Sequence, residues 1–177
     1  MRLFDYIQQG GPVMYILLLL NIIGFALLAW KIFTIVGAKK DFPQTVQSLK
    51  KELDISTNSS DSSASITIVK DEVQMTVHKL ESGLNTIKII ASIAPLLGLL
   101  GTVLGILSAF KVISDSGLSN PSLFAGGIAM ALLTTVGGLI VAIPHFVGYN
   151  YLVGALDDFE IQLEKSLVKE IFGSKNV

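Results

Sequence analysis

Three threonine hydroxyls and one imidazole are the groups in the apolar part of this sequence that could take part in proton chemistry. They belong to Thr102, Thr134, Thr135 and His145. A hydroxyl donates and accepts hydrogen bonds, so it can pass a proton or hold a water molecule, but it carries no charge at physiological pH. The ordinary alternative for each threonine is a hydroxyl bonded to a carbonyl of its own helix. Histidine titrates near neutral pH, so His145 is a less favoured candidate for a proton carrier, the alternative being a packed or interfacial side chain.

Three long apolar stretches must position these groups. Gly11–Trp30 has Asn21 as its only strongly polar side chain, and Ile89–Phe110 and Ser116–Leu156 contain no Asp, Glu, Lys or Arg. A helix of about 20 apolar residues crosses the roughly 30 Å of hydrocarbon in a bilayer. A composition of 51% hydrophobic and 15% charged residues is typical of a membrane protein. We therefore expect an all-α polytopic protein with three membrane spans, the first of them uncleaved because it is too long for a signal peptide.

The basic residues predict the orientation of the spans. Eleven of the 13 lie between the first two spans or after the third, which places these segments in the cytoplasm and the N-terminus in the periplasm. Apolar residues spaced by three or four from Ile66 to Ile87 and from Leu152 to Ile171 predict two long helices that continue spans 2 and 3 and pack on each other. The expected organisation is a periplasmic segment 1–10, TM1 11–36, a cytoplasmic segment 37–88 with a flexible part 54–65 and an amphipathic helix 66–88, TM2 89–113, a periplasmic link 114–121, TM3 122–148 and a cytoplasmic helix 149–177.

Small residues in spans 2 and 3 predict close helix contacts. Lipid provides no hydrophobic force between helices, so small side chains that let backbones approach are what hold helices together in a membrane. The residues expected to serve helix packing or to face the lumen of an assembly are Gly98, Gly101, Gly105, Met130, Ala131 and Gly138. Span 1, rich in Leu, Ile and Phe, is expected to face lipid. Because three helices make a thin bundle, we expect the subunit to assemble into a ring.

The two threonine positions are expected to lie at one depth. The midpoint of the second apolar stretch falls close to Thr102, and that of a span from Leu123 to Val147 falls at Thr135. An intramembrane ionisable residue usually marks an ion path, and these spans offer only hydroxyl relays. A proton carrier with a carboxylate should therefore come from another polypeptide.

Several classes of protein fit the sequence poorly. The chain has no cysteine, and its formal net charge is -1, which argues against thiolate chemistry and a nucleic-acid partner. It contains no nucleophile and base pair, metal cluster or phosphate loop, so we expect neither a cofactor nor an enzyme. A channel that works without a partner is also disfavoured, because the three apolar stretches contain no Asp, Glu, Lys or Arg to mark an ion path. A structural membrane scaffold would explain the glycines but not the paired threonines.

Two motifs carry a resemblance to a known family. Residues 94–110, APLLGLLGTVLGILSAF, and residues 126–144, GGIAMALLTTVGGLIVAIP, resemble the span 2 and span 3 signatures of the MotA/TolQ/ExbB proton channel family, in its three-span ExbB and TolQ branch. The resemblance implies a homopentamer around the single-span helices of an ExbD or TolR type dimer, each with an essential Asp. It also implies that Thr102 and Thr135, with Thr134 beside them, line the pore. Many ExbB and TolQ proteins have Glu where this chain has Met130, so here the partner must supply the acid.

The function that the resemblance implies is a motor subunit driven by the proton motive force in the bacterial inner membrane. In the ExbB interpretation, the motor energises a TonB-type periplasmic transducer for import through the outer membrane. In the TolQ interpretation, it acts on TolA in envelope maintenance. The sequence leaves both open.

Overall fold

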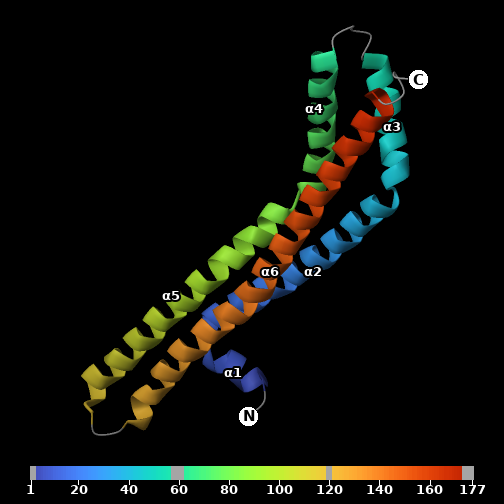
Figure 1. Ribbon diagram of the computed structural model, residues 1–177. Coiled ribbons are helices and arrows are strands. Elements are labelled where there is room, and N and C mark those ends of the chain that lie inside the picture. The colour runs from blue at the N-terminus through green and yellow to red at the C-terminus, as the bar shows by residue number, and fades with distance from the viewer. Residues whose placement is uncertain (1–2, 57–61, 119–120, 173–177) are drawn as a thin grey trace. The chain divides into compact units, whose positions relative to one another are not determined.

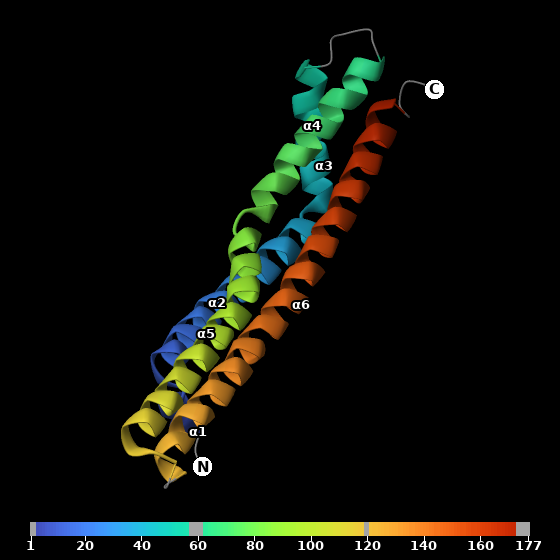
Figure 2. The same cartoon turned by 90° about the vertical axis from the view of Figure 1, so that its left-hand side faces the viewer.

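The computed structural model describes residues 3–56, 62–118 and 121–172, and within these ranges every regular element is a helix (Figures 1 and 2). The helices are α1 (Leu3–Gln9), α2 (Gly11–Lys40), α3 (Phe42–Ser56), α4 (Ser62–Glu81), α5 (Leu84–Ser116) and α6 (Ser122–Phe172). The chain divides into two compact units, which are described separately. Unit 1 comprises Met1–Leu28 and Thr86–Tyr149, and unit 2 comprises Ala29–Asn85 and Asn150–Val177.

Three of the helices are long and apolar enough to cross a membrane, as the sequence predicts. They are α2, α5 and α6 over Gly11–Lys40, Leu84–Ser116 and Ser122–Ile171. The third span continues without interruption into the C-terminal helix, because α6 has 51 residues. Pro144 lies inside α6 and lacks the N–H that would bond the carbonyl of Ile140, a loss that a long helix in a membrane tolerates.

Glycines in the left-handed region set three helix boundaries. Gly11 has a φ of 66° where α2 begins, and Gly117 has a φ of 72° where α5 ends. The Gly117 N–H donates to the carbonyl of Ile113 at 2.8 Å, which closes α5 with a glycine C-cap. Gly83, with a φ of 90°, separates α4 from α5. The prediction of one uninterrupted amphipathic helix over 66–88 that runs into span 2 is therefore wrong, because only glycine adopts this φ without strain and the helix stops there.

Other expected boundaries differ by a few residues. The flexible part expected over 54–65 is narrower, since residues 54–56 belong to α3 and residues 62–65 to α4, while 57–61 lie outside the described residues. The N-terminal segment 1–10 contains the short helix α1. In the link expected over 114–121, α5 extends to Ser116, and residues 119–120 lie outside the described ranges, as do 173–177 at the end of the C-terminal helix.

Unit 1 is built on α6, which contacts α5 on one face and α2 on another. Its buried cluster combines residues of all three helices: Val13, Leu17, Ile90, Ala94, Val141 and Ala142. Gly137 of α6 lies against Met14 of α2, since a Cβ added there would be 2.8 Å from the Met14 Sδ. Gly148 lies in the same way against Leu28. The expectation that span 1 faces lipid can therefore apply to only part of its surface, because one face of α2 packs on α6.

Unit 2 confirms the two predicted apolar stripes except at Ile66, which is exposed at the start of the first stripe. Buried residues follow α4 and α6 at intervals of three or four, namely Val69, Val73, Val77, Leu152, Leu156, Phe159, Leu163 and Leu167. The rings of Phe42 and Phe159 meet edge to face, with centroids 5.6 Å apart. The ion pair between Lys70 of α4 and Glu164 of α6, at 3.4 Å, is exposed and adds little to stability. Apolar burial therefore holds this helical bundle together.

Candidate functional site

The small residues of α5 and α6 pack against each other within one chain. A Cβ added to Gly98 would lie 2.9 Å from the Thr134 carbonyl oxygen, and one added to Gly105 would lie 2.6 Å from the Gly127 carbonyl oxygen. A Cβ on Gly138 would lie 2.6 Å from the carbonyl oxygen of Ala94. Because real Cβ atoms do not approach so closely, the two helices can touch only through glycine at these positions.

This contact also accounts for Gly101 and Ala131. Gly101 faces the side chain of Thr134, while Ala131 is buried opposite Gly105. The small residues of α5 and α6, which were expected to contact other subunits, thus contact each other within one chain. Ring assembly can no longer be inferred from those residues and needs separate support.

The contact is antiparallel and brings the threonines to one level. Gly101 lies against Thr134, whereas Gly105 lies against Ala131 and Gly98 against Gly138. Thr102 follows the first of these residues on α5, and Thr135 follows its counterpart on α6. Because the helices are antiparallel, these two steps run in opposite directions, and the register places Thr102 and Thr135 within about 3 Å of one level along the helix pair, two residues at 1.5 Å each. This agrees with their positions near the centres of the two apolar stretches.

The three threonines differ in exposure. Thr134 has 0% of its surface exposed, so its hydroxyl lines no opening of the described chain. We therefore keep the prediction of a pore-lining role for Thr102 and Thr135 only. The Thr134 Oγ1 lies 3.0 Å from the carbonyl oxygens of Met130 and Ala131. Thr102 and Thr135 are half-buried. They lie at the rim of the α5 and α6 contact rather than inside it.

All three hydroxyls donate to carbonyls of their own helices, which is the ordinary state of a threonine in a membrane helix. Thr102 donates to Leu99, and Thr135 donates to Ala131 at 3.4 Å. The oxygen of each half-buried hydroxyl keeps lone pairs that accept a hydrogen bond from outside. The pair can therefore receive a hydrogen bond from a water molecule or a protonated carboxyl, but it holds no charge of its own.

His145 lies away from this pair, in the α2 and α6 contact. Its ring is fully buried against Gly24 and Phe25, with 4.9 Å between the two ring centroids. Its Nδ1 lies 2.6 Å from the Val141 carbonyl oxygen, and its Nε2 has no hydrogen-bond partner among the described residues. Ten residues of helix separate it from Thr135, or about 15 Å at 1.5 Å per residue. The structure thus does not bring the imidazole and the threonine pair together.

Met130 faces the beginning of α2. Its Cε would lie 3.0 Å from a Cβ added to Gly11, and the side chain is half-buried. The thioether packs against the joint between α1 and α2, where its flexibility suits an irregular space. Met130 is thus not part of the α5 and α6 contact, which the other residues predicted to serve helix packing do form.

Sequence reasoning missed the glycines of the α2 and α6 contact, which are Gly24, Gly137 and Gly148. A signal was present, because Gly137, His145 and Gly148 recur at intervals of eight and three and so share one face of a helix. This face is distinct from the one that carries Ala131, Thr134 and Gly138. Two separate rows of small residues on one span predict two neighbouring helices.

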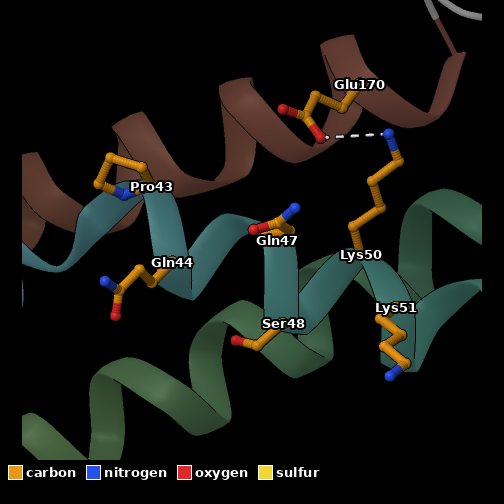
Figure 3. Close-up of a pocket in the computed structure, with 7 residues that line it drawn as sticks. All are labelled: Pro43, Gln44, Gln47, Ser48, Lys50, Lys51 and Glu170. Carbon is orange, nitrogen blue, oxygen red and sulfur yellow. Dashed lines mark ion pairs between the residues drawn. The ribbon is translucent and has the colours of Figure 1, made fainter.

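Two grooves offer no competing chemistry. The groove in unit 1 has a volume of about 420 Å³ and is lined mainly by apolar residues of α1, α2 and α6. One groove in unit 2 has a volume of about 1060 Å³ and is lined by Pro43, polar residues of α3 and Glu170 of α6, with Lys50 and Glu170 paired at 3.3 Å (Figure 3). No group of three or more His, Asp or Glu able to hold a metal ion occurs in the part of the chain that the structure describes. The level threonine pair remains the candidate site.

These features define a polytopic helical membrane protein in which paired hydroxyls lie on a glycine-packed antiparallel helix pair. The chain belongs to the MotA/TolQ/ExbB proton channel family, whose sequence model matches residues 42–165. The similar proteins place it in the ExbB and TolQ branch.

Three relatives illustrate the similarity. Biopolymer transport protein exbB1 of Vibrio cholerae is 41% identical over 91 residues, which are 51% of this chain and 40% of that protein. Biopolymer transport protein ExbB of Aquifex aeolicus is 49% identical over 75 residues, or 42% of this chain and 51% of that protein. Tol-Pal system protein TolQ of Haemophilus influenzae is 40% identical over 76 residues, or 43% of this chain and 33% of that protein. The matches thus span about half or less of these relatives.

Proposed function

We propose that this chain is a proton-channel subunit of an inner-membrane motor of the ExbB and TolQ type. In this proposal, the proton motive force drives the motor, and a partner protein carries the proton. The observation that supports it most directly is the level pair of half-buried hydroxyls, Thr102 and Thr135, at the rim of a glycine-packed helix contact. Membership of a proton channel family supports the same reading.

The spans lack a group that could carry the proton alone. Ile89–Phe110 and Ser116–Leu156 contain no carboxylate and no basic side chain other than His145, which packs against α2. We infer that a single-span partner of the ExbD or TolR type inserts an Asp beside the threonines. Moving one charge across 100 mV supplies about 2.3 kcal/mol, enough to bias the protonation of a buried carboxyl.

The threonine pair then serves as a resting place for that Asp. When ionised, the carboxylate accepts hydrogen bonds from water held there, or from the two hydroxyls once these turn away from the carbonyls of Leu99 and Ala131. When protonated, it donates to the hydroxyl oxygens. In its neutral form it can leave the pair for an apolar surface at low cost, whereas a charged carboxylate cannot. Alternation between these two states would convert proton passage into movement of one chain against the other.

An exposed apolar stripe on α5 provides a surface on which another chain could pack. Leu96, Leu99, Val103, Leu107 and Phe110 recur every three or four residues, with 57–65% of each side chain's surface exposed. Lipid or another subunit must cover this stripe. We propose a homopentamer that surrounds the partner helices, with the N-terminus in the periplasm and the C-terminus in the cytoplasm, as the distribution of lysines predicts.

The same motor could act on either of two transducers. Relatives named ExbB favour a TonB-type transducer that energises import through the outer membrane, and the relative named TolQ favours a TolA-type transducer in envelope maintenance. We favour the first. Co-purification of the chain with its transducer from native membranes distinguishes the two.

The experiment that tests the channel proposal is proton flux in vesicles that contain the chain and its single-span partner. Thr102→Val and Thr135→Val retain nearly the same shape and remove the hydroxyl, so proton-driven flux should fall at least about tenfold in each, the effect that loss of a charged hydrogen bond of about 1.5 kcal/mol would have.

Thr134→Val is the matched control. It removes the hydroxyl of the adjacent residue, which is fully buried and bonded to its own helix, so flux should remain near that of the native protein. Partner co-purification checks assembly in each variant. Full flux in both Thr102→Val and Thr135→Val would show that these hydroxyls serve only their own helices, and a scaffold role would then be the better account.

A further inference from the structure

Lys31 is a buried lysine in unit 2. It lies on α2, and only 3% of its surface is exposed. Lysine is almost never fully buried without a partner, because an ammonium loses its hydration there. None of the ion pairs found among the described residues includes Lys31. The burial of this charge therefore requires a specific explanation.

The ammonium of Lys31 contacts the end of α4. Its Nζ donates to the carbonyl oxygen of Leu80 at 3.1 Å and lies 5.0 Å from the centre of the Trp30 ring. Leu80 is in the last turn of α4, where carbonyls have no partner within the helix and the helix dipole places partial negative charge. Lys31 thus caps α4 from a different helix.

The contact extends to the turn between α4 and α5. Gly83, whose φ is 90°, lies so close that an added Cβ would be 3.3 Å from the Lys31 Cε. The Ser82 N–H donates to the carbonyl of His78 at 3.2 Å, which is the last hydrogen bond before the helix stops. A single glycine joint and a single cross-helix hydrogen bond therefore meet at one point.

This point is close to the border of unit 2. The chain crosses this border three times: in α2 between Leu28 and Ala29, in α5 between Asn85 and Thr86, and in α6 between Tyr149 and Asn150. Lys31 follows the first crossing by two residues, and Gly83 precedes the second by two. Of the three chain crossings, only the one beside Gly83 is next to a break in helix, since α2 and α6 continue through their crossings.

We propose that the joint between α4 and α5 is a hinge and that Lys31 is its latch. With the latch closed, the ammonium fixes the last turn of α4 and fills the space beside Gly83. With the latch open, the ammonium regains water and the joint becomes free to bend about the glycine. The proposal goes beyond the channel function and does not depend on it.

The latch is expected to open readily. An ammonium has three donors, and one carbonyl and one aromatic face are the partners that the described residues give it. Without a carboxylate, the electrostatic gain offsets only part of the desolvation of the charge. A balance of this kind suits an element that opens and closes rather than a permanent structural pin.

Hydrogen exchange of the full chain in lipid nanodiscs tests the proposal. Lys31→Met retains the unbranched stem and removes the ammonium, so exchange of the Ser82 amide and of the amides in the last turn of α4 should accelerate by about tenfold or more, as loss of a charged hydrogen bond implies. The matched control is Lys88→Met. Lys88 is also a lysine over an aromatic ring, with its Nζ 5.7 Å from the centre of Tyr149, but it is exposed and lies beyond the joint, so its loss should leave these amides unchanged.

Unchanged exchange at the joint in Lys31→Met would overturn the latch. If that variant exchanges faster throughout unit 2, labelling of the native protein with an amine-reactive reagent decides the matter. A latch requires Lys31 to react at least about tenfold more slowly than exposed Lys88, since exposure and donor freedom both favour the latter. It also requires Gly83→Ala, which strains the joint, to raise the rate at Lys31. Equal rates for the two lysines, or no response to Gly83→Ala, would refute the proposal.

Discussion

The contact between Gly101 and Thr134 gives the sharpest test of how α5 and α6 are held together. In Gly101→Ala, the new Cβ would lie 2.7 Å from the Thr134 Cγ2 and nearer still to its Cβ and Oγ1. Thr134 is fully buried, and its Oγ1 lies within hydrogen-bond distance of two carbonyls, so the side chain has no free direction in which to move. The helices must therefore separate, and this loosens the glycine contacts on either side.

The size of the effect follows from two opposing terms. Overpacking of a close contact costs about 1–3 kcal/mol, and the rigid neighbours here place Gly101→Ala at the upper end of that range. Alanine in place of glycine in a helix returns about 1 kcal/mol. We expect the free energy of unfolding to fall by about 2 kcal/mol, the difference between these two terms.

Gly126→Ala on α6 is the matched control. No atom lies within 4 Å of a Cβ added there, so only the helix term acts, and the variant should gain up to about 1 kcal/mol. Equilibrium unfolding in mixed micelles, followed by circular dichroism, measures both variants. A Gly101→Ala protein as stable as Gly126→Ala would refute the contact.

A double-mutant cycle separates this contact from general damage. Thr134→Gly removes the atoms that the new Cβ would meet, so in the Gly101→Ala background it should restore stability. The expected coupling energy is at least about 1 kcal/mol, in the range found for residues in direct contact. Simple additivity of the two changes would mean that the residues do not touch.

Two further predictions follow from the structure. His145→Ala should lower the free energy of unfolding by about 2–4 kcal/mol, because it leaves a cavity against Gly24, yet proton flux per folded complex should be retained; loss of flux with normal stability would instead make the imidazole a proton carrier. A cysteine at Leu118, which is exposed, should react with a membrane-impermeant thiol reagent in intact cells, whereas one at exposed Gln74 should not, and the reverse pattern would invert the proposed orientation.

The sequence predicted the spans and apolar stripes well because each depends on a local pattern. Uncharged runs of sufficient length, and Val69, Val73 and Val77 at helical spacing, define which residues are buried whatever the neighbouring helix is. Gly83 shows the limit. This residue lies within a continuous apolar stripe, and only its observed φ of 90° shows that the helix breaks there rather than continuing through a tolerated glycine.

The sequence predicted the level of the candidate site along the helices but not the direction in which its side chains point. The midpoints of two uncharged runs place Thr102 and Thr135 level, and the structure has the same register. Composition could not reveal that Thr134 turns toward Gly101 and becomes buried, because adjacent residues on a helix point about 100° apart and the neighbour's direction is set by packing. Lys31 escaped notice for a related reason: its acceptor is a backbone carbonyl that leaves no trace in the sequence.

The two glycine faces of α6 also restrict how this helix can change length. One face contacts α5 through Gly127, Thr134 and Gly138, and the other contacts α2 through Gly137, His145 and Gly148. Both faces belong to one unbroken helix. Inserting a single residue anywhere from Gly127 to Gly148 would rotate everything beyond it by about 100° and shift it by about 1.5 Å. At least one neighbour would then meet bulky side chains where it now meets glycine. Gains and losses of residues are therefore expected to concentrate at the turns near Gly83 and Gly117, where no helix has to stay in phase.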